Sequence, residues 1–295
     1  MLRNRSKKKI DRIGYLFILP NVLIYGFFIF IPTFFTIFYS FTNFNLFQWR
    51  FIGIYNYIRI FNDDFFLKAM RNTFLYAGGT IFISLSLGLL LANLLNGTVP
   101  GGRVFRPLFY LPNTISIIAA CMAWLYIYNP NTGILNYIIR ALRGTPQNWL
   151  LDAKLALRCI IIMGIWATMG YNMIVFTAGL QGIPEYLYEA ARIDGAGVFS
   201  QFFRITLPML APTTFFLFVM SVISSFQVFG QVYTMTNGGP MNATTTIVHQ
   251  IYQNGFEGYR MGYASSQAVF LLVITTAITL LTFRYGDRSK DVELA

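Results

Sequence analysis

Long stretches without any charged residue divide this 295-residue chain. Six such windows cover 13–49, 72–102, 107–139, 159–184, 205–256 and 261–283. Each exceeds the roughly 20 apolar residues that a helix needs to cross the hydrocarbon core of a bilayer. The apolar runs are continuous and do not alternate with polar residues, which favours helices over a barrel. With 56% hydrophobic and only 11% charged residues, the composition lies far outside that of a soluble domain. We therefore expect an all-α integral membrane protein.

Hydropathy and clusters of polar, Gly and Pro residues reduce the windows to six transmembrane helices, near 13–41, 74–96, 107–128, 159–180, 213–235 and 263–283. The 205–256 window holds one span, because the chain from Thr236 onward is too polar and Gly-rich to leave its backbone in lipid. Pro20 and Pro32 should bend the first helix. The expected domains are a basic N-terminus 1–12, a transmembrane domain 13–283 that includes a cytoplasmic loop 185–208, and a cytoplasmic tail 284–295.

The distribution of Lys and Arg predicts the orientation. With the N-terminus inside, thirteen of the 22 Lys and Arg residues fall in cytoplasmic segments and nine in outer loops. The positive-inside rule then favours both termini in the cytoplasm, although the outer loop 129–157 weakens the asymmetry. This topology explains most of the net charge of +11, and the cluster from Arg3 to Arg12 is expected to lie against anionic headgroups of the bilayer. No basic groove with interleaved aromatic residues supports a nucleic-acid partner.

The sequence contains no recognisable catalytic or nucleotide-binding constellation. His249 is the only histidine, and neither His-Glu-x-x-His nor Gly-x-Ser-x-Gly occurs. No Gly-Lys dipeptide occurs either, so the phosphate-binding loop Gly-x-x-x-x-Gly-Lys-Ser/Thr is absent. We expect no enzyme activity, no metal and no cofactor on this chain. If ATP drives the protein, another chain binds it.

The loop 185–208 is a polar, Gly-containing insertion between two apolar stretches. Pro184 suits a first helical position and Glu185 the first turn, so a short helix should begin there. It should end at Asp194-Gly195, where glycine can adopt the left-handed conformation. A second amphipathic segment, 198–207, then leads to Pro208. By residue type alone, two interpretations stay open: an amphipathic loop lying on the membrane, or a helix-turn-helix that presents Glu189 and Arg192 to another protein.

A spaced motif decides between them. Glu189-Ala190-Ala191, Gly195, Ile205 and Leu207-Pro208 reproduce the EAA motif, and the loop resembles the coupling loop of permease subunits in binding-protein-dependent ABC importers. In that family a short helix seats in a cleft of the ATPase. The resemblance assigns ATPase coupling to the motif residues and their neighbours, namely Glu189, Ala190, Ala191, Arg192, Asp194, Gly195, Ile205, Leu207 and Pro208.

Most of the chain resembles the sugar-importing permeases of the maltose and multiple-sugar type. YLFILPNVLIYGFFIFIPTFFTIFYSFTNF is similar to that family's first span, and LFYLPNTISIIAACMAWLYIYNPNTGILN to its third. The large maltose permease has additional N-terminal spans and a sizeable extracellular domain, which are missing here. The resemblance implies the type I ABC importer permease fold with six transmembrane helices, in the cytoplasmic membrane of a bacterium.

The resemblance also implies a function and partners. The chain would form half of a translocation path for a carbohydrate, delivered by an extracellular solute-binding protein. Its partners would be a second homologous permease and two ATPase subunits, which bind ATP and Mg, and helix 185–194 would dock on one ATPase subunit. Glycerol phosphates or other polyols are the alternative substrates. Charge-free spans argue against an ATP-independent secondary carrier, which would more often bury ionisable groups.

Candidate substrate residues follow from the family match. It places Tyr171, Ser221, Ser225 and Gln227 at sugar-contacting positions, and a looser match adds Asn113. Serines on membrane helices also pack against neighbours or bond their own backbone, so that alternative stays open. Asn237, Gly238, Gly239 and Pro240 form either an ordinary turn or a contact with the binding protein or a gate.

Overall fold

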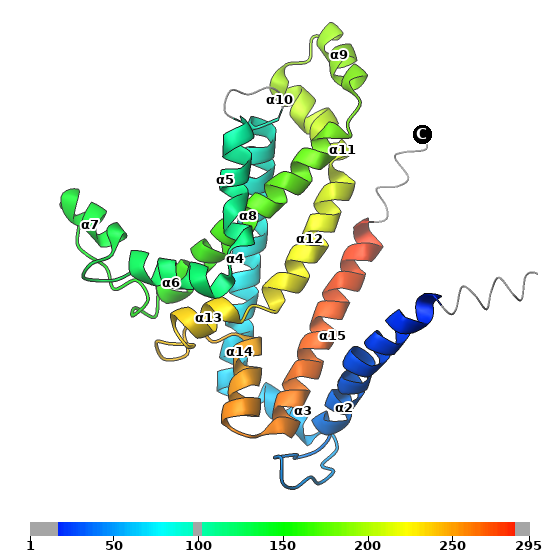
Figure 1. Cartoon of the computed structure of the whole chain (residues 1–295), viewed down its shortest axis with the longest axis vertical. Helices are drawn as coiled ribbons and strands as arrows, with labels where there is room; N and C mark the ends of the chain where they lie inside the picture. Colours follow the sequence, from blue (N-terminus) through cyan, green and yellow to red (C-terminus); the bar gives the residue numbers. More distant parts are fainter. Residues whose placement is uncertain (1–16, 97–101, 287–295) are drawn as a thin grey trace, which may run out of the picture. The chain divides into compact units, whose positions relative to one another are not determined.

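The computed structural model describes residues 17–96 and 102–286 and is mostly helical (Figure 1). The predicted N-terminus 1–12 and most of the predicted tail, 287–295, lie outside the described residues. Pairing of extended chain in the described part is limited to an isolated bridge between Thr42 and Phe51. The described residues form two compact units, one of residues 17–61 and 251–270 and the other of residues 62–96, 102–250 and 271–286.

The first unit begins with a long apolar helix, Phe17–Ser40, which continues through both of its prolines. Its middle is a π-turn, η1 (Gly26–Phe30), followed by α2 (Ile31–Ser40). At the junction the Ile31 N–H donates to the Gly26 carbonyl, five residues back. Because Pro32 has no N–H and its ring crowds the preceding turn, a wider turn just before it accommodates the ring without ending the helix.

Polar contacts join the rest of the first unit to the end of this helix. In α3 (Tyr55–Phe61), the buried Asn56 amide donates to the carbonyls of Ser40 (2.9 Å) and Thr42 (2.8 Å). The start of α15 (Met261–Gly286) lies against the same segment, since the Gly262 N–H donates to the Phe44 carbonyl at 2.8 Å. The Arg59 guanidinium lies 4.4 Å from the centroid of the Tyr263 ring.

The second unit is built around one buried helix. Helix α8 (Ala156–Gln181) packs against α4 (Asp64–Leu94), α5 (Gly102–Thr114) and α12 (Ala211–Phe226), as Figure 1 shows. Small residues permit the close approach: a Cβ at Gly170 would lie 1.9 Å from the Phe109 carbonyl oxygen of α5. Such contacts are typical of helices packed in membranes, where dispersion and not the hydrophobic effect drives association.

Two expected spans are interrupted. Helices Val104–Thr114 and Ile117–Ile127 (α6) meet at 102°, so the span expected near 107–128 is not one straight helix. Ser116, between them, has an extended backbone (φ −52°, ψ 130°). The span expected near 213–235 ends as a continuous helix at Phe226, and α13 (Gly230–Met235) follows after Gln227 to Phe229. Among the described residues, four helices are long and apolar enough to cross a membrane. The number rises to six if each of two bent pairs is one span, namely Val104–Thr114 with Ile117–Ile127, and Val198–Met209 with Ala211–Phe226, which meet at 63°.

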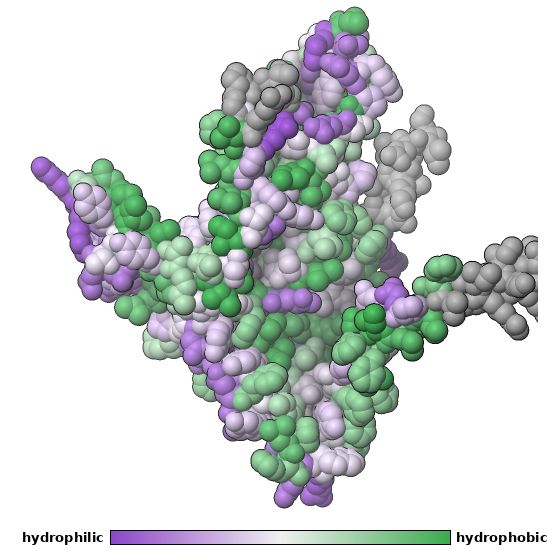
Figure 2. All heavy atoms as spheres, viewed as in Figure 1, coloured by the Kyte–Doolittle hydropathy of each residue, from purple (hydrophilic) through white to green (hydrophobic). Residues whose placement is uncertain are grey.

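Short helices complete the described chain. They are α7 (Ile134–Ala141), α9 (Glu185–Ile193), α10 (Val198–Gln201), η2 (Phe202–Thr206), α11 (Leu207–Met209), α14 (Ile247–Tyr252) and η3 (Gln253–Glu257). In Figure 2, hydrophilic residues gather over α9, whereas large hydrophobic areas cover the long helices. The predicted polar loop 185–208 therefore contains α9 to α11 and lies at one end of α8.

Candidate functional site

Helix α9 has the start and stop that its sequence predicts. It runs over Glu185–Ile193, with Glu185 in its first turn and Arg192 in its last. Pro184 was expected at the first helical position, but it is the N-cap, the residue directly before that position, with φ −61° and ψ 130°. This conformation suits a cap because proline fixes φ near this value in any case.

The C-terminal end of α9 is closed by glycine. Gly195 has φ +78°, and its N–H donates to the Arg192 carbonyl at 3.1 Å. The Ala196 N–H reaches the Ala191 carbonyl at 2.8 Å, which completes a Schellman motif. A Cβ at Gly195 would have open space around it, so the requirement for glycine comes from the backbone angle alone. The predicted role of Gly195 in turning the chain is thus supported by geometry.

One face of α9 is unpartnered within the described chain. None of its residues is buried, and Tyr186 (65%) and Ile193 (87%) expose most of their side chains. Glu189 and Ala190 are also exposed and share this face, since the four positions follow helical spacing. Ala191 is half-buried on the other side. Sequence reasoning named Glu189 and Ala190 but missed Tyr186 and Ile193. These two lie three and four residues from Glu189 and Ala190, so helical spacing could have placed them on the same face.

Hydrogen bonds fix α9 against the segment that follows. The Tyr188 hydroxyl lies 2.9 Å from Thr206 Oγ1 in η2, and the Gln201 amide donates to the Ala196 carbonyl at 2.8 Å. The π-turn η2 precedes Pro208, as η1 precedes Pro32, and here the Leu207 N–H donates to the Phe202 carbonyl. Ile205 is half-buried, whereas Leu207 and Pro208 are exposed at the start of α11. The loop is therefore a fixed corner between two membrane helices.

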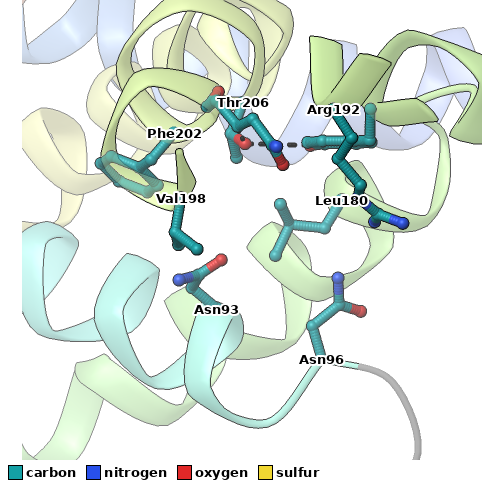
Figure 3. A pocket seen from close by; sticks show the side chains of 9 residues that line it. Asn93, Asn96, Leu180, Arg192, Val198, Phe202 and Thr206 are labelled. Atoms are coloured by element: carbon teal, nitrogen blue, oxygen red, sulfur yellow. Dashed lines mark hydrogen bonds between the residues drawn. The ribbon is translucent and has the colours of Figure 1, made fainter. Parts of the chain in front are cut away.

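A cavity of about 260 Å³ lies behind this corner (Figure 3). Its lining combines α4, α9 and α10–η2, and consists of Asn93, Asn96, Leu180, Tyr188, Arg192, Val198, Gln201, Phe202 and Thr206. A second, mainly apolar cavity of about 360 Å³ lies between the end of α4 and α10–η2 and includes Leu89, Leu90, Phe199 and Phe203. Residues at the end of α4 and residues of α10–η2 thus line the same two cavities.

The candidate substrate residues lie on three neighbouring helices. Asn113 is exposed near the end of α5, Tyr171 is half-buried on α8, and Gln227 is exposed at the C-cap of α12. Ser225 is buried and Ser221 half-buried, one turn apart on α12. Because α8 contacts both α5 and α12, Tyr171 belongs to the helix between the other two.

Two of these residues flank breaks in helices. Asn113 lies just before the bend between α5 and α6, and Gln227 lies at the break between α12 and α13. The helices that follow the breaks meet, since α6 packs on α13 and a Cβ at Gly230 would lie 3.3 Å from Ile117 Cγ2. Non-helical backbone at membrane depth is tolerated only where protein buries it or where it lines a water-filled cavity. The paired breaks are consistent with a polar path beside α8.

The segment Asn237 to Pro240 is a tightly packed turn. Asn237 (φ +46°) and Gly238 (φ +81°) are left-handed, and the Gly239-Pro240 peptide bond is cis. A Cβ at Gly238 would lie 2.5 Å from Thr245 Oγ1 and 2.8 Å from His249 Cε1. His249 is buried, and its Nε2 lies 3.1 Å from Asn237 Oδ1, so the single histidine of the sequence packs against this turn and contacts it through a polar group.

Helix α4 holds this turn in place. Asn72 donates its amide to the carbonyls of Asn242 (3.2 Å) and Thr245 (3.0 Å), and Lys68 Nζ to that of Met241 (2.6 Å). Met241 remains 78% exposed at the tip. Among the residues described, no group of three or more His, Cys, Asp or Glu side chains could hold a metal ion.

Comparisons with known proteins agree with the fold. Residues 84–290 match the family described as "Binding-protein-dependent transport system inner membrane component". The chain therefore belongs to this family, whose members are membrane permease components of ABC importers, and the resemblance noted in the sequence is confirmed.

Individual relatives cover almost the whole chain. It is 36% identical to the probable ABC transporter permease protein YurN of Bacillus subtilis, over 95% of this chain and 97% of that protein. It is 34% identical to the sn-glycerol-3-phosphate transport system permease protein UgpA of Agrobacterium fabrum, over 93% and 94%. A chain from the crystal structure of a bacterial ABC transporter that imports the acidic polysaccharide alginate is 25% identical, with a TM-score of 0.85 over 97% and 99%. The expected type I importer permease fold is thus confirmed.

Proposed function

We propose that this chain is the transmembrane subunit of an ATP-driven importer for a carbohydrate, and that it forms half of the translocation path beside a second, homologous permease. The observation that carries the proposal is α9, a capped helix with an exposed face, held at a fixed angle by the Tyr188–Thr206 contact. Both termini would then be cytoplasmic, in the cytoplasmic membrane of a bacterium.

The exposed face of α9 suits a docking site for a separate ATPase subunit. Tyr186 and Ile193 offer apolar side chains on either side of Glu189, and small Ala190 permits close approach. A few buried aromatic or aliphatic anchors usually supply most of the binding energy of a protein interface. ATP and Mg would be bound by two such ATPase subunits, whose closure moves α9.

The candidate path residues favour an uncharged substrate. Asn113, Tyr171, Ser221, Ser225 and Gln227 provide hydroxyl and amide groups, and no Lys or Arg lies in 107–139 or 205–256. A phosphate group is usually recognised by Arg or Lys through charge-assisted hydrogen bonds. On this half of the path a neutral sugar is therefore better matched than the glycerol phosphate carried by some relatives.

The turn at Asn237 to Pro240 is the candidate contact for an extracellular solute-binding protein. Its exposed tip at Met241 is held by Lys68 and Asn72, so the tip presents a preformed surface. A preformed surface reduces the entropy lost on association.

Reconstitution tests the proposal. Vesicles containing this chain, its partner permease and the ATPase should take up the sugar only with ATP and the binding protein, and Glu189→Lys should abolish uptake while leaving the membrane complex intact. Uptake that persists without the ATPase would instead identify a secondary carrier. Competition between a neutral sugar and glycerol phosphate decides the substrate class: inhibition by glycerol phosphate alone would contradict the carbohydrate assignment.

A further inference from the structure

The short helix α7 carries an exposed apolar stripe. Ile134 (53%), Tyr137 (72%), Ile138 (47%) and Leu142 (78%) follow helical spacing and expose their side chains together. The opposite side faces the protein, where Asn136 is fully buried and Leu135 packs against the core around Tyr128 and Cys159. Three exposed hydrophobic residues on this eight-residue helix, together with Leu142 at its C-cap, indicate a covering partner.

Hydrogen bonds lock α7 to the first turn of a membrane span. Asn136 donates to the carbonyls of Pro130 (2.9 Å) and Gln147 (2.8 Å), and its own Oδ1 accepts from the Trp149 indole at 3.0 Å. Trp149 in turn accepts a hydrogen bond at its carbonyl from Cys159 Sγ (3.7 Å), and the Tyr128 hydroxyl donates to the Cys159 carbonyl (3.2 Å).

These bonds fix the depth of α7. Cys159 lies in the first turn of α8, the span that begins at Ala156 and ends at Gln181, next to the coupling loop. The start of α8 is a membrane boundary, because Lys154 and Arg158 border the apolar run there. The helix α7, bonded to this boundary through Trp149, therefore lies level with the bilayer surface on the side opposite α9.

The charges around α7 match a lipid surface. Arg143 directly follows the stripe, and Arg140 lies within its sequence range, exposed and donating to the carbonyls of Pro130 and Asn131 (both 3.2 Å). Asp152 is the only acidic residue between Asn129 and Arg158. In Figure 2, hydrophobic and hydrophilic residues lie next to one another over the part of the chain where α7 lies. An amphipathic helix with an apolar stripe and basic flanks inserts its apolar face into the boundary between headgroups and acyl chains.

We propose that α7 is an interfacial helix, whose residues Ile134, Tyr137, Ile138 and Leu142 insert into the bilayer leaflet opposite the coupling loop, with Arg140 and Arg143 at the lipid phosphates. The occupant is an anionic phospholipid surface. It anchors the junction of α6 and α8, and so the bend between α5 and α6, at a fixed height in the membrane.

Depth-dependent fluorescence quenching tests the proposal on the full permease complex in vesicles of phosphatidylethanolamine and phosphatidylglycerol. A polarity-sensitive fluorophore is attached at Tyr137→Cys or, independently, at Leu142→Cys, and at Thr132→Cys as the matched control in the same loop. The native thiols of Cys121 and Cys159 are buried and should not be labelled. Quenchers are nitroxides placed high or low on the lipid acyl chain, and iodide in water.

Labels on the stripe should be quenched about threefold more strongly by the shallow nitroxide than the label at Thr132→Cys, because inserted side chains reach about 5–10 Å into the interface. Iodide should show the reverse order. Equal quenching of all sites by iodide would overturn the proposal. Stripe labels that become shielded only when solute-binding protein is added would also overturn it and would identify a protein-docking surface. Neither result depends on transport, so the proposed function is tested separately.

Discussion

Replacing Gly195 tests whether its left-handed backbone conformation is needed for docking of the ATPase. The residue has φ +78°, and a Cβ there would meet no atom within 4 Å, so Gly195→Ala introduces no clash. The change costs only the left-handed conformation, about 1–2 kcal/mol for an L-residue with a Cβ. If docking requires the Schellman turn, this cost lowers the affinity for the ATPase by a factor of about 5–30.

The affinity of the ATPase for permease in nanodiscs measures this effect directly. Gly195→Asn should lose less than Gly195→Ala, because asparagine tolerates left-handed angles, and Gly195→Val should lose more. Gly182→Ala is the matched control in the same segment, since Gly182 has φ −80° and a Cβ there makes only ordinary contacts. Equal affinities for Gly195→Ala, Gly182→Ala and the unchanged protein would refute the reasoning.

Three further changes probe other parts of the chain. Ile193→Ser removes an exposed apolar side chain and should weaken ATPase binding by about 1.5–3 kcal/mol if the interface buries that side chain. Ile193→Leu should bind normally, and titration of the ATPase onto permease in nanodiscs compares the two variants. Gly170→Val places atoms against the Phe109 carbonyl, so it should lower the thermal midpoint of the complex. Gly78→Val, with open space around its Cβ, should not, and normal melting of both variants would contradict the proposed packing of α8 on α5. Asn72→Leu leaves the carbonyls of Asn242 and Thr245 without this donor, which should cost about 1–3 kcal/mol of stability in a melting assay. It should also reduce the stimulation of ATP hydrolysis by the binding protein, and unchanged stimulation in an ATPase assay would show that the turn does not take part in coupling.

Local rules explain why α9 could be predicted from the sequence. Pro184 and Gly195 act on their own backbone, so the predicted helix 185–194 differs by one residue from the observed Glu185–Ile193. Hydropathy, in contrast, reports only apolar length. It placed the start of the second span near 74, although α4 begins at Asp64, because Asp63 caps a first polar turn that continues the same helix.

The interruptions escaped prediction because they depend on neighbouring helices. The break after Thr114 is accommodated where α6 packs on α13. Pro112, two residues before the end of α5, was the available signal, because a proline removes a backbone hydrogen bond, but it does not by itself predict a bend of 102°. The bend expected at Pro20 and Pro32 stays a prediction, since the structure shows that the helix continues through both prolines and that a π-turn precedes Pro32. The helix α7 was also missed, since it is short and lies in a loop whose basic residues only weakened the charge asymmetry. The roles of the candidate substrate residues remain predictions.

Helix α4 has a mechanical consequence for the importer. Near one end, Lys68 and Asn72 donate to carbonyls of the segment 241–245, which directly follows the turn at Asn237 to Pro240, and near the other, Asn93 lines the cavity behind α9. These ends are roughly 30 Å apart along the axis at about 1.5 Å per residue. Its 31 residues form one continuous α-helix without a proline or a π-turn, although the pair Gly78-Gly79 near its middle is a site where a long helix can bend. We therefore expect α4 to connect the external turn with the cavity behind α9 as one continuous helix, with any change in its tilt arising at Gly78-Gly79.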